Sequence, residues 1–284
     1  ANHDRTQFGA LSDLVHSVER HGYYGMPRLL FATCKRFAQY AQERHLRLRK
    51  ANFTIEYETT IPRQSGLGGS SAMIIAALRA LLGFHRVPER RVPPAALASL
   101  ALSVETQELG IAAGLQDRVV QSCGGLTYMD FSPDRPCYER LDSKLLPSFG
   151  LAYLAEQHLG TMESGVVHSQ VRYRWEQGDP EVRKAVRELA RSAEQGRRAL
   201  EKGDLKQLAR LMNRNHDLRV SLFGQALGAH NIELVEIARG LGLSAKLPGS
   251  SGAALVLLDD AAAESKLAAV YAVKGYRYQP IEVF

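Results

Sequence analysis

The chain has 284 residues, of which 45% are apolar and 23% charged, and its formal net charge is +6. These values are typical of a globular protein, and they exclude a disordered, collagen-like or coiled-coil chain. No apolar run reaches the roughly 18 residues of a membrane span, and the start of the chain shows no pattern typical of a secretory signal. We therefore expect no membrane partner.

The positive charge is dispersed along the chain. Its densest stretch, Arg44 to Lys50, is interleaved with Leu46 and Leu48, which is typical of a helix end whose long side chains cover apolar surface. This distribution predicts no nucleic-acid partner and leaves small anionic molecules open as ligands. Three widely spaced cysteines make neither a disulfide framework nor a zinc site, so they indicate a reducing, cytoplasmic location.

The first half of the chain mixes helical and strand-like patterns. Apolar residues at helical spacing predict a helix from Leu11 that ends at Gly22. Alternation from Phe53 to Ile61 predicts a half-buried strand that Pro62 ends. A Gly/Ser turn, residues 65–71, follows it. Further helices are predicted over residues 27–44, 72–82 and 93–109, and short strands over residues 127–131 and 151–155.

The second half begins with a long, charged helical pattern from Glu181 to Phe223 that Gly203-Asp204 interrupts. We interpret it as a plain pair of helices, because a lone repeat unit cannot bury its apolar face. Helices are also predicted over residues 231–241 and 261–273, and strands over residues 253–258 and 276–283. Strands and helices in both halves predict an α+β fold with two domains and a seam near residue 150.

The turn Ser65 to Ser71 joins the predicted strand to an apolar helix. Its glycines allow a close ligand approach, and the free N–H groups and positive dipole end of the helix favour an anion. Ser70 and Ser71 add hydroxyls that can cap the helix or reach a metal. The turn lacks both the Lys-Ser/Thr of a P-loop and the spacing of a dinucleotide fingerprint. Two interpretations stay open, an anion site or a structural turn with serine caps.

A second segment concentrates carboxylates. Glu105 and Glu108 precede a glycine-punctuated turn, and Asp117 follows beside Arg118. Phosphoryl transfer needs a carboxylate on Mg²⁺ and often another that orients or deprotonates the accepting hydroxyl. The alternative, which this segment alone favours, is a solvated helix end with an Asp–Arg pair on the surface.

Together these segments resemble the GHMP kinases, the superfamily of galactokinase, homoserine kinase, mevalonate kinase and phosphomevalonate kinase. The resemblance lies in three ordered motifs: Pro62-x-x-x-Gly66-Leu67-Gly68-Gly69-Ser70-Ser71-Ala72, then Gly114-Leu115-Gln116-Asp117-Arg118 with Gly124-Gly125, and then Ala245-Lys246-Leu247-Pro248-Gly249-Ser250-Ser251-Gly252. Within the superfamily the chain is similar to the glucuronokinases, through Ile61-Pro62-Arg63-Gln64, Glu108-Leu109-Gly110-Ile111, Val167-His168-Ser169 and Val171-Arg172-x-Arg174-Trp175.

The resemblance implies a fold and an activity. It implies an ATP-binding half with the ribosomal protein S5 domain 2-like fold over residues 1–150 and a GHMP C-terminal half over residues 151–284. The implied activity is that of an ATP- and Mg²⁺-dependent sugar 1-kinase acting on a sugar acid, D-glucuronate. The alternatives are another sugar, such as galacturonate or a heptose phosphate, and a non-catalytic nucleotide-binding homologue.

The resemblance also implies roles for individual residues. Asp117 matches the catalytic aspartate, which accepts the proton of the anomeric hydroxyl, and Ser70 and Glu105 are the implied Mg²⁺ ligands, with Glu108 as the alternative carboxylate. The implied ATP phosphate-binding residues are Pro62, Gly66, Leu67, Gly68, Gly69, Ser70, Ser71 and Ala72. The substrate-binding candidates are Arg63, Arg118, His168, Arg172, Arg174, Gly249, Ser250, Ser251 and Gly252. The arginines are candidates because a guanidinium group can bind the carboxylate of a sugar acid through two hydrogen bonds.

The chain departs from the superfamily pattern in two places. The first motif, an N-terminal strand and turn, has no match, so we expect further residues before Ala1 in the natural protein and the first strands of the N-terminal domain on them. In the third motif, Pro248 and two serines replace a threonine and glycines. Both departures support the non-catalytic homologue as the alternative from another class.

Overall fold

The computed structural model describes residues 6–25, 27–62, 65–132, 134, 136–154, 164–249 and 252–283, with only the backbone of residues 164–168. The chain forms two compact units, each with its own core. The first contains Ala1–Thr60 and Gly68–Arg140, and the second contains Ile61–Leu67 and Leu141–Phe284. The short segment before Gly68 therefore belongs to the C-terminal unit.

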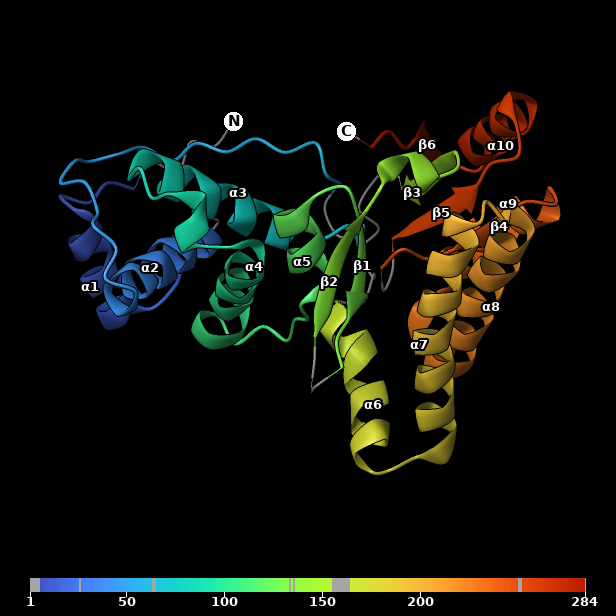
Figure 1. Cartoon of the computed structure of the whole chain (residues 1–284), viewed down its shortest axis with the longest axis horizontal. Helices are drawn as coiled ribbons and strands as arrows, with labels where there is room; N and C mark the ends of the chain where they lie inside the picture. The colour runs from blue at the N-terminus through green and yellow to red at the C-terminus, as the bar shows by residue number, and fades with distance from the viewer. Residues whose placement is uncertain are drawn as a thin grey trace. The chain divides into compact units, whose positions relative to one another are not determined.

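The first unit is mainly helical (Figure 1). Its helices are α1 (Leu11–His21), α2 (Arg28–Glu43), α3 (Gly69–Phe84), α4 (Pro94–Ser103) and α5 (Gln116–Cys123), with a 3₁₀ turn at Glu89–Arg91 and a π-helical turn, η2, at Val104–Glu108. Two short strands, β1 (Leu126–Asp130) and β2 (Cys137–Leu141), pair with each other. The helices predicted over residues 11–22, 27–44 and 72–82 and the strand predicted over residues 127–131 are confirmed within a few residues at their ends.

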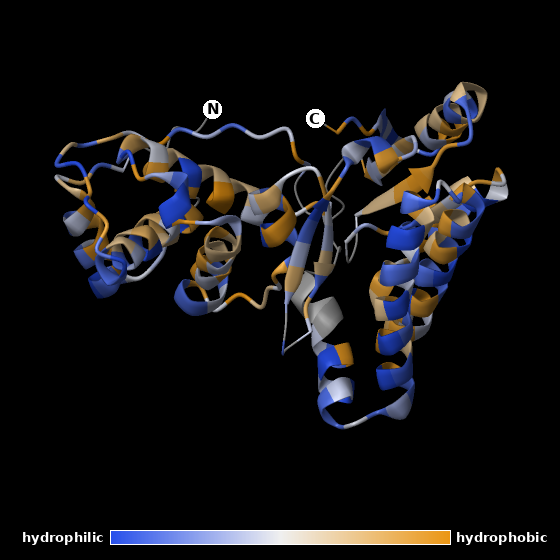
Figure 2. Ribbon diagram, in the orientation of Figure 1, coloured by the Kyte–Doolittle hydropathy of each residue, from blue (hydrophilic) through white to orange (hydrophobic). Residues whose placement is uncertain are grey.

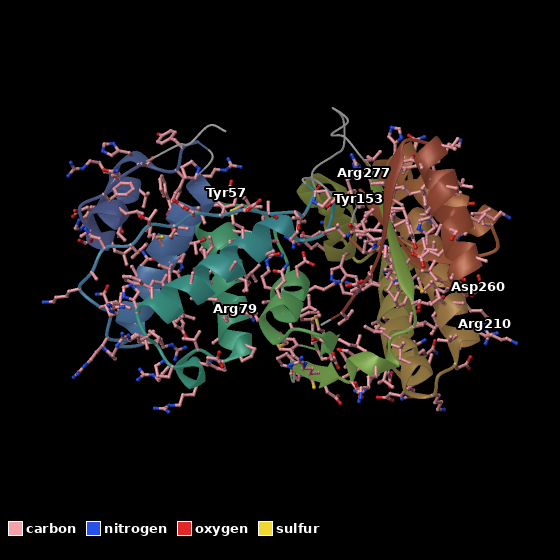
Figure 3. All side chains as sticks on the ribbon, turned by 90° about the horizontal axis from the view of Figure 1, so that it is seen from above. Tyr57, Arg79, Tyr153, Arg210, Asp260 and Arg277 are labelled. Carbon is pink, nitrogen blue, oxygen red and sulfur yellow. The ribbon has the colours of Figure 1, made fainter. Side chains whose placement is uncertain are left out.

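The core of this unit forms where α2, α3 and α4 meet. Phe37, Ile74, Leu78, Ala101 and Val104 are fully buried there. Because α3 is apolar on nearly all sides, other helices of the unit, among them α2 and α4, pack against it. Arg79 on α3 also donates to the Ser122 carbonyl oxygen at the end of α5, at 3.0 Å (Figure 3).

The strand predicted from Phe53 to Ile61 is wrong. Residues 51–60 carry no strand in the structure. Phe53 and Ile55 pack against the core, whereas the Tyr57 side chain is 47% exposed (Figure 3). A strand needs a partner for its backbone hydrogen bonds, and β1 and β2 pair with each other. The alternation indicated two residues that are partly buried against the core, but it did not indicate a sheet.

The second unit contains a four-stranded sheet and five helices within its described residues (Figure 1). The strands are β3 (Phe149–Leu154), β4 (Ser244–Lys246), β5 (Ala253–Leu257) and β6 (Tyr276–Pro280), in the order β4-β5-β3-β6 with every neighbour antiparallel. The helices are α6 (Ser164–Glu176), α7 (Pro180–Glu201), α8 (Leu205–Phe223), α9 (Ala229–Gly240) and α10 (Ala261–Val273), with 3₁₀ turns at Ser143–Leu145 and Gly224–Leu227. In the register of β3 and β6, Tyr153 lies opposite Arg277 (Figure 3).

Helices cover both faces of this sheet. Ala254 and Val256 of β5 pack into a core with α9 and α10, while Leu255 and Leu257 pack against α7 and α8. This arrangement explains the unbroken apolar run of β5, since both faces of the strand are covered. Figure 2 shows hydrophilic residues along α7, which the charged helical pattern predicted.

The predicted helical pair from Glu181 to Phe223 is confirmed as α7 and α8, and the helices predicted over residues 231–241 and 261–273 are confirmed as α9 and α10. Helices α5 and α6 and strands β2 and β4 were not predicted. None of the helices in the described part of the chain is long and apolar enough to cross a membrane.

Candidate active site

The start of α3 is shaped to receive an anion. Gly68 precedes the helix in the left-handed conformation (φ 67°, ψ 32°), and its carbonyl oxygen accepts from the Ala72 N–H at 2.9 Å. No side chain caps this end, whereas Asp179, Asp204 and Asp260 cap α7, α8 and α10. The first N–H groups of α3 and the positive end of its dipole are therefore available to a phosphate.

The two serines of the turn do not cap α3, so the interpretation with serine caps is wrong. The Ser71 hydroxyl donates to the Gly68 carbonyl oxygen at 2.8 Å. The Ser70 hydroxyl donates to Glu105 Oε1 at 2.9 Å, across 35 residues of sequence. The structure thus brings together the two side chains that the resemblance implied as magnesium ligands.

Glu105 lies in the π-helical turn that follows α4, and its residue is only 2% exposed. Arg118 Nη2 donates to Glu105 Oε2, and Arg118 Nη1 donates to the Gly114 carbonyl oxygen at 2.9 Å. Glu108 instead accepts from the Tyr23 hydroxyl at 2.8 Å and from Lys35 Nζ at 2.9 Å. The geometry therefore favours Glu105 over Glu108 as the carboxylate beside Ser70.

Asp117 lies in the first turn of α5, and its side chain is 47% exposed. Its Oδ2 is 3.6 Å from Arg118 Nη1. Burial raises the pKa of Asp117, the Arg118 guanidinium opposes this, and the Glu105 carboxylate adds to the rise. Two carboxylates thus share one buried arginine. Because Arg118 is only 5% exposed, the alternative of an Asp–Arg pair on the surface is wrong.

Gly68 lies directly against this cluster. A methyl group in place of its hydrogen would come within 3.2 Å of Asp117 Cγ and 3.0 Å of Gln121 Nε2. Gly68, directly before α3, and the first turn of α5 are therefore in contact within the first unit. Gln121 was not predicted as a site residue, although its position four residues after Asp117 places both on one face of α5.

The remaining candidates lie elsewhere or outside the described residues. Arg174 on α6 forms a 2.8 Å ion pair with Asp179, the residue before α7. Arg172 is exposed on α6. The guanidinium of Arg118 already donates to the Gly114 carbonyl oxygen and to Glu105. Arg63, Ser250 and Ser251 lie outside the described residues, as does the side chain of His168.

In the second unit, Gly249 packs on Gly66. A methyl group at Gly249 would overlap the Gly66 carbonyl oxygen, so this approach requires glycine. Gly252, at φ 87°, donates its N–H to Asn231 Oδ1 at 2.6 Å. The turn between β4 and β5 is thereby held against the segment that leads into Gly68.

The Leu247 carbonyl oxygen, just before this turn, accepts from Arg219 Nη1 at 3.1 Å and from Lys246 Nζ at 2.8 Å. Asn231, Arg219 and Lys246 were not predicted as site residues. Their contacts depend on how α8 and α9 pack on β4, for which the sequence holds no local signal.

The donor set fits a magnesium ion that is bound mainly by its nucleotide. Within the described residues no three His, Cys, Asp or Glu side chains cluster in a way that could hold a metal. Ser70 and Glu105 supply two hard oxygen ligands beside an anion-binding helix end. Mg²⁺ commonly uses one or two protein oxygens together with phosphates and water.

Comparisons with known proteins identify the family of the chain. The model of the GHMP kinases N terminal domain matches residues 29–125, and the model of the GHMP kinases C terminal domain matches residues 197–274. The chain belongs to the GHMP kinases. It is therefore a phosphotransferase, and the two-domain α+β fold expected for this superfamily is confirmed.

Two relatives are similar along nearly the whole chain. The probable glucuronokinase 2 of Arabidopsis thaliana is 44% identical over 290 residues, which cover 99% of this chain and 78% of that protein. Glucuronokinase 1 of the same plant is 42% identical with the same coverage. The structure of Lactococcus lactis galactokinase complexed with galactose has a TM-score of 0.72 at 16% identity, covering 93% of this chain and 77% of that one, and it supports the fold.

Proposed function

We propose that the protein is an ATP- and Mg²⁺-dependent sugar kinase that converts D-glucuronate to D-glucuronate 1-phosphate. One observation carries the proposal. Asp117, the Ser70–Glu105 pair and the uncapped start of α3 lie together in one unit of the structure. The sequence identity of 42–44% to glucuronokinases supports the choice of sugar.

In the proposed mechanism, the N–H groups at the start of α3 bind the ATP phosphates and hold the γ-phosphate in place. Ser70 and Glu105 would hold Mg²⁺, which would supply neutralisation of phosphate charge. Asp117 accepts the proton of the anomeric hydroxyl, which makes that oxygen a better nucleophile. The transfer is driven mainly by positioning and by neutralised charge, because phosphoryl transfer leaves little covalent work to the protein.

Arg118 serves both carboxylates in this proposal. Its guanidinium donates to Glu105 and lies 3.6 Å from Asp117, so it holds both carboxylates in place. Burial raises the pKa of Asp117, which brings this base closer to the working pH and makes proton transfer more favourable.

A panel of sugars with coupled detection of ADP tests the proposal. We expect D-glucuronate to have the highest kcat/KM, and a product whose phosphate is on the anomeric carbon by phosphorus NMR. A higher kcat/KM for galacturonate or a heptose phosphate would contradict the choice of sugar. ATP binding in calorimetry without turnover of any sugar would instead support the non-catalytic homologue.

The proposal places the reaction in the cytoplasm. Cys34, Cys123 and Cys137 are all free thiols in the structure, and Cys137 is exposed. Free, unpaired cysteines are typical of a reducing compartment, where ATP is also available.

A further inference from the structure

The carbonyl oxygen of Gly68 has an unusual number of donors. It accepts from the Ala72 N–H at 2.9 Å, from the Ser71 hydroxyl at 2.8 Å and from Gln121 Nε2 at 3.1 Å. The first two bonds are local to the start of α3. The third comes from α5, 53 residues later in the sequence, and it ties the two helices together.

Gln121 lies one helical turn after Asp117 on α5. Both side chains lie against Gly68, because a methyl group there would come within 3.0 Å of Gln121 Nε2 and 3.2 Å of Asp117 Cγ. The helix that carries the proton acceptor thus touches the phosphate-binding loop through these two side chains. Of the two, Gln121 makes the hydrogen bond to the loop.

The other end of the same amide is left without a partner. Gln121 Oε1 is buried and accepts no hydrogen bond within the described structure. The orientation of the amide follows from its surroundings, since only the nitrogen can donate to the Gly68 carbonyl oxygen. A buried acceptor without a donor destabilises the fold, so a methionine of similar length would suit the fold at least as well. Stability therefore does not explain why this position is a glutamine.

We propose that Gln121 is a positioning residue that fixes the phosphate-binding start of α3 relative to Asp117 through its bond to Gly68. Its loss leaves both elements folded but lets the loop move with respect to the base. A misplacement of about 1 Å can cost on the order of a hundredfold in rate, because reacting groups must be held in a near-attack geometry. The inference rests on the proposed function for the role of Asp117.

Three variants test this role: Gln121→Met removes the donor, Gln121→Glu replaces it with an acceptor, and Gln195→Met is the matched control on an exposed site of α7. For Gln121→Met we expect an unchanged or higher Tm, because the unpaired acceptor is gone. We also expect kcat to fall at least about tenfold while KM for the sugar changes little. For Gln121→Glu we expect a larger loss and a shift of the acidic limb of the pH profile to higher pH, since a second carboxylate raises the pKa of Asp117.

Hydrogen exchange without substrate gives an independent measurement. We expect Gln121→Met to speed exchange at the first hydrogen-bonded amides of α3, with the rest of the chain unchanged. Unchanged exchange with kcat within twofold of the parent would overturn the role, and so would a fall in Tm with faster exchange throughout the unit. If the parent phosphorylates no sugar acid, the proposed function fails, but the exchange experiment still decides whether Gln121 holds the loop.

Discussion

The two units treat buried charge in opposite ways. In the first unit, Arg118 lies between the carboxylates of Glu105 and Asp117, so positive and negative charges neutralise each other. In the second, Arg219 and Lys246 both donate to the Leu247 carbonyl oxygen, and within the described residues neither has a carboxylate partner. The first cluster thus pairs opposite charges around one arginine.

The second cluster instead favours the loss of charge. Burial, with a contribution from Arg219, lowers the pKa of Lys246 to about 7. His216 on α8 is 1% exposed, neither of its ring nitrogens has a hydrogen-bond partner among the described residues, and burial lowers its pKa to about 4. The comparison shows that a nearby opposite charge counteracts the effect of burial on the pKa, as Arg118 does at Asp117, and that no such contribution from the described part of the chain acts on Lys246.

Replacing Arg118 by methionine breaks the charge balance of the first unit. Two carboxylates then lose their common cation, and removing one partner of a buried ion pair typically costs about 3–5 kcal/mol of stability. We expect a loss of this size in urea unfolding. In the double variant with Glu105→Gln we expect part of the stability to return, but not the activity. If the Arg118→Met variant were as stable as the parent, the ion pair of Arg118 and Glu105 would not contribute to stability.

Asp117→Asn keeps the shape of the site and removes its base. We expect kcat to fall at least about a hundredfold, since loss of a general base typically costs ~10²–10⁴-fold, with ATP binding little changed in calorimetry. Asp259→Asn, at an exposed loop position, is the control and keeps full activity. A kcat within a few-fold of the parent in Asp117→Asn would refute the catalytic role.

Ser70→Ala removes the hydroxyl that donates to Glu105. We expect the apparent Mg²⁺ requirement of the kinase to rise several-fold, because one of two protein ligands is lost, while the fold is kept. Glu105→Gln tests the other ligand in the same titration. A normal Mg²⁺ requirement in both variants would remove these two residues from the metal site.

Lys246→Met tests the second unit. The folded pKa of Lys246 lies below that of the unfolded chain, so between about pH 7 and pH 10 the unfolded state binds more protons and this group adds stability as the pH rises. We expect the stability difference between variant and parent to change by at most about 1.4 kcal/mol per pH unit in this window, in favour of the parent at higher pH. Lys266→Met, on an exposed side of α10, shows no such slope. A difference independent of pH would mean that Lys246 stays charged throughout.

Local patterns in the sequence predicted most helices and the chemistry of the loop before α3. The apolar run after Ser71 predicted α3, and the glycines before it predicted an anion site that the uncapped helix end supports. The pattern failed from Phe53 to Ile61, because alternation reports burial while a strand also needs a partner. Periodicity could not show that residues 61–67 pack with the C-terminal unit.

The candidate site was predicted less completely than the fold. The family motifs point to Ser70, Glu105 and Asp117, but their spacing does not show that Arg118 joins the two carboxylates. Gln121 and Arg219 were missed, because each donates to a backbone carbonyl oxygen that only the packing of separate elements brings near. Lys246 donates to the carbonyl oxygen of the next residue, a contact for which the sequence pattern gives no signal.

The π-helical turn at Val104–Glu108 makes the site sensitive to the deletion of a single residue at this point. Glu105 and Glu108 are three residues apart and would share a face in a regular α-helix, yet Glu105 meets Arg118 while Glu108 meets Lys35. A π turn holds one more residue than an α turn, so loss of a single residue here would tighten it and rotate one carboxylate away from its partner. We expect substitutions at exposed Thr106 to leave this geometry intact, whereas a deletion there would displace Glu105, the proposed metal ligand, without changing any other side chain of the site.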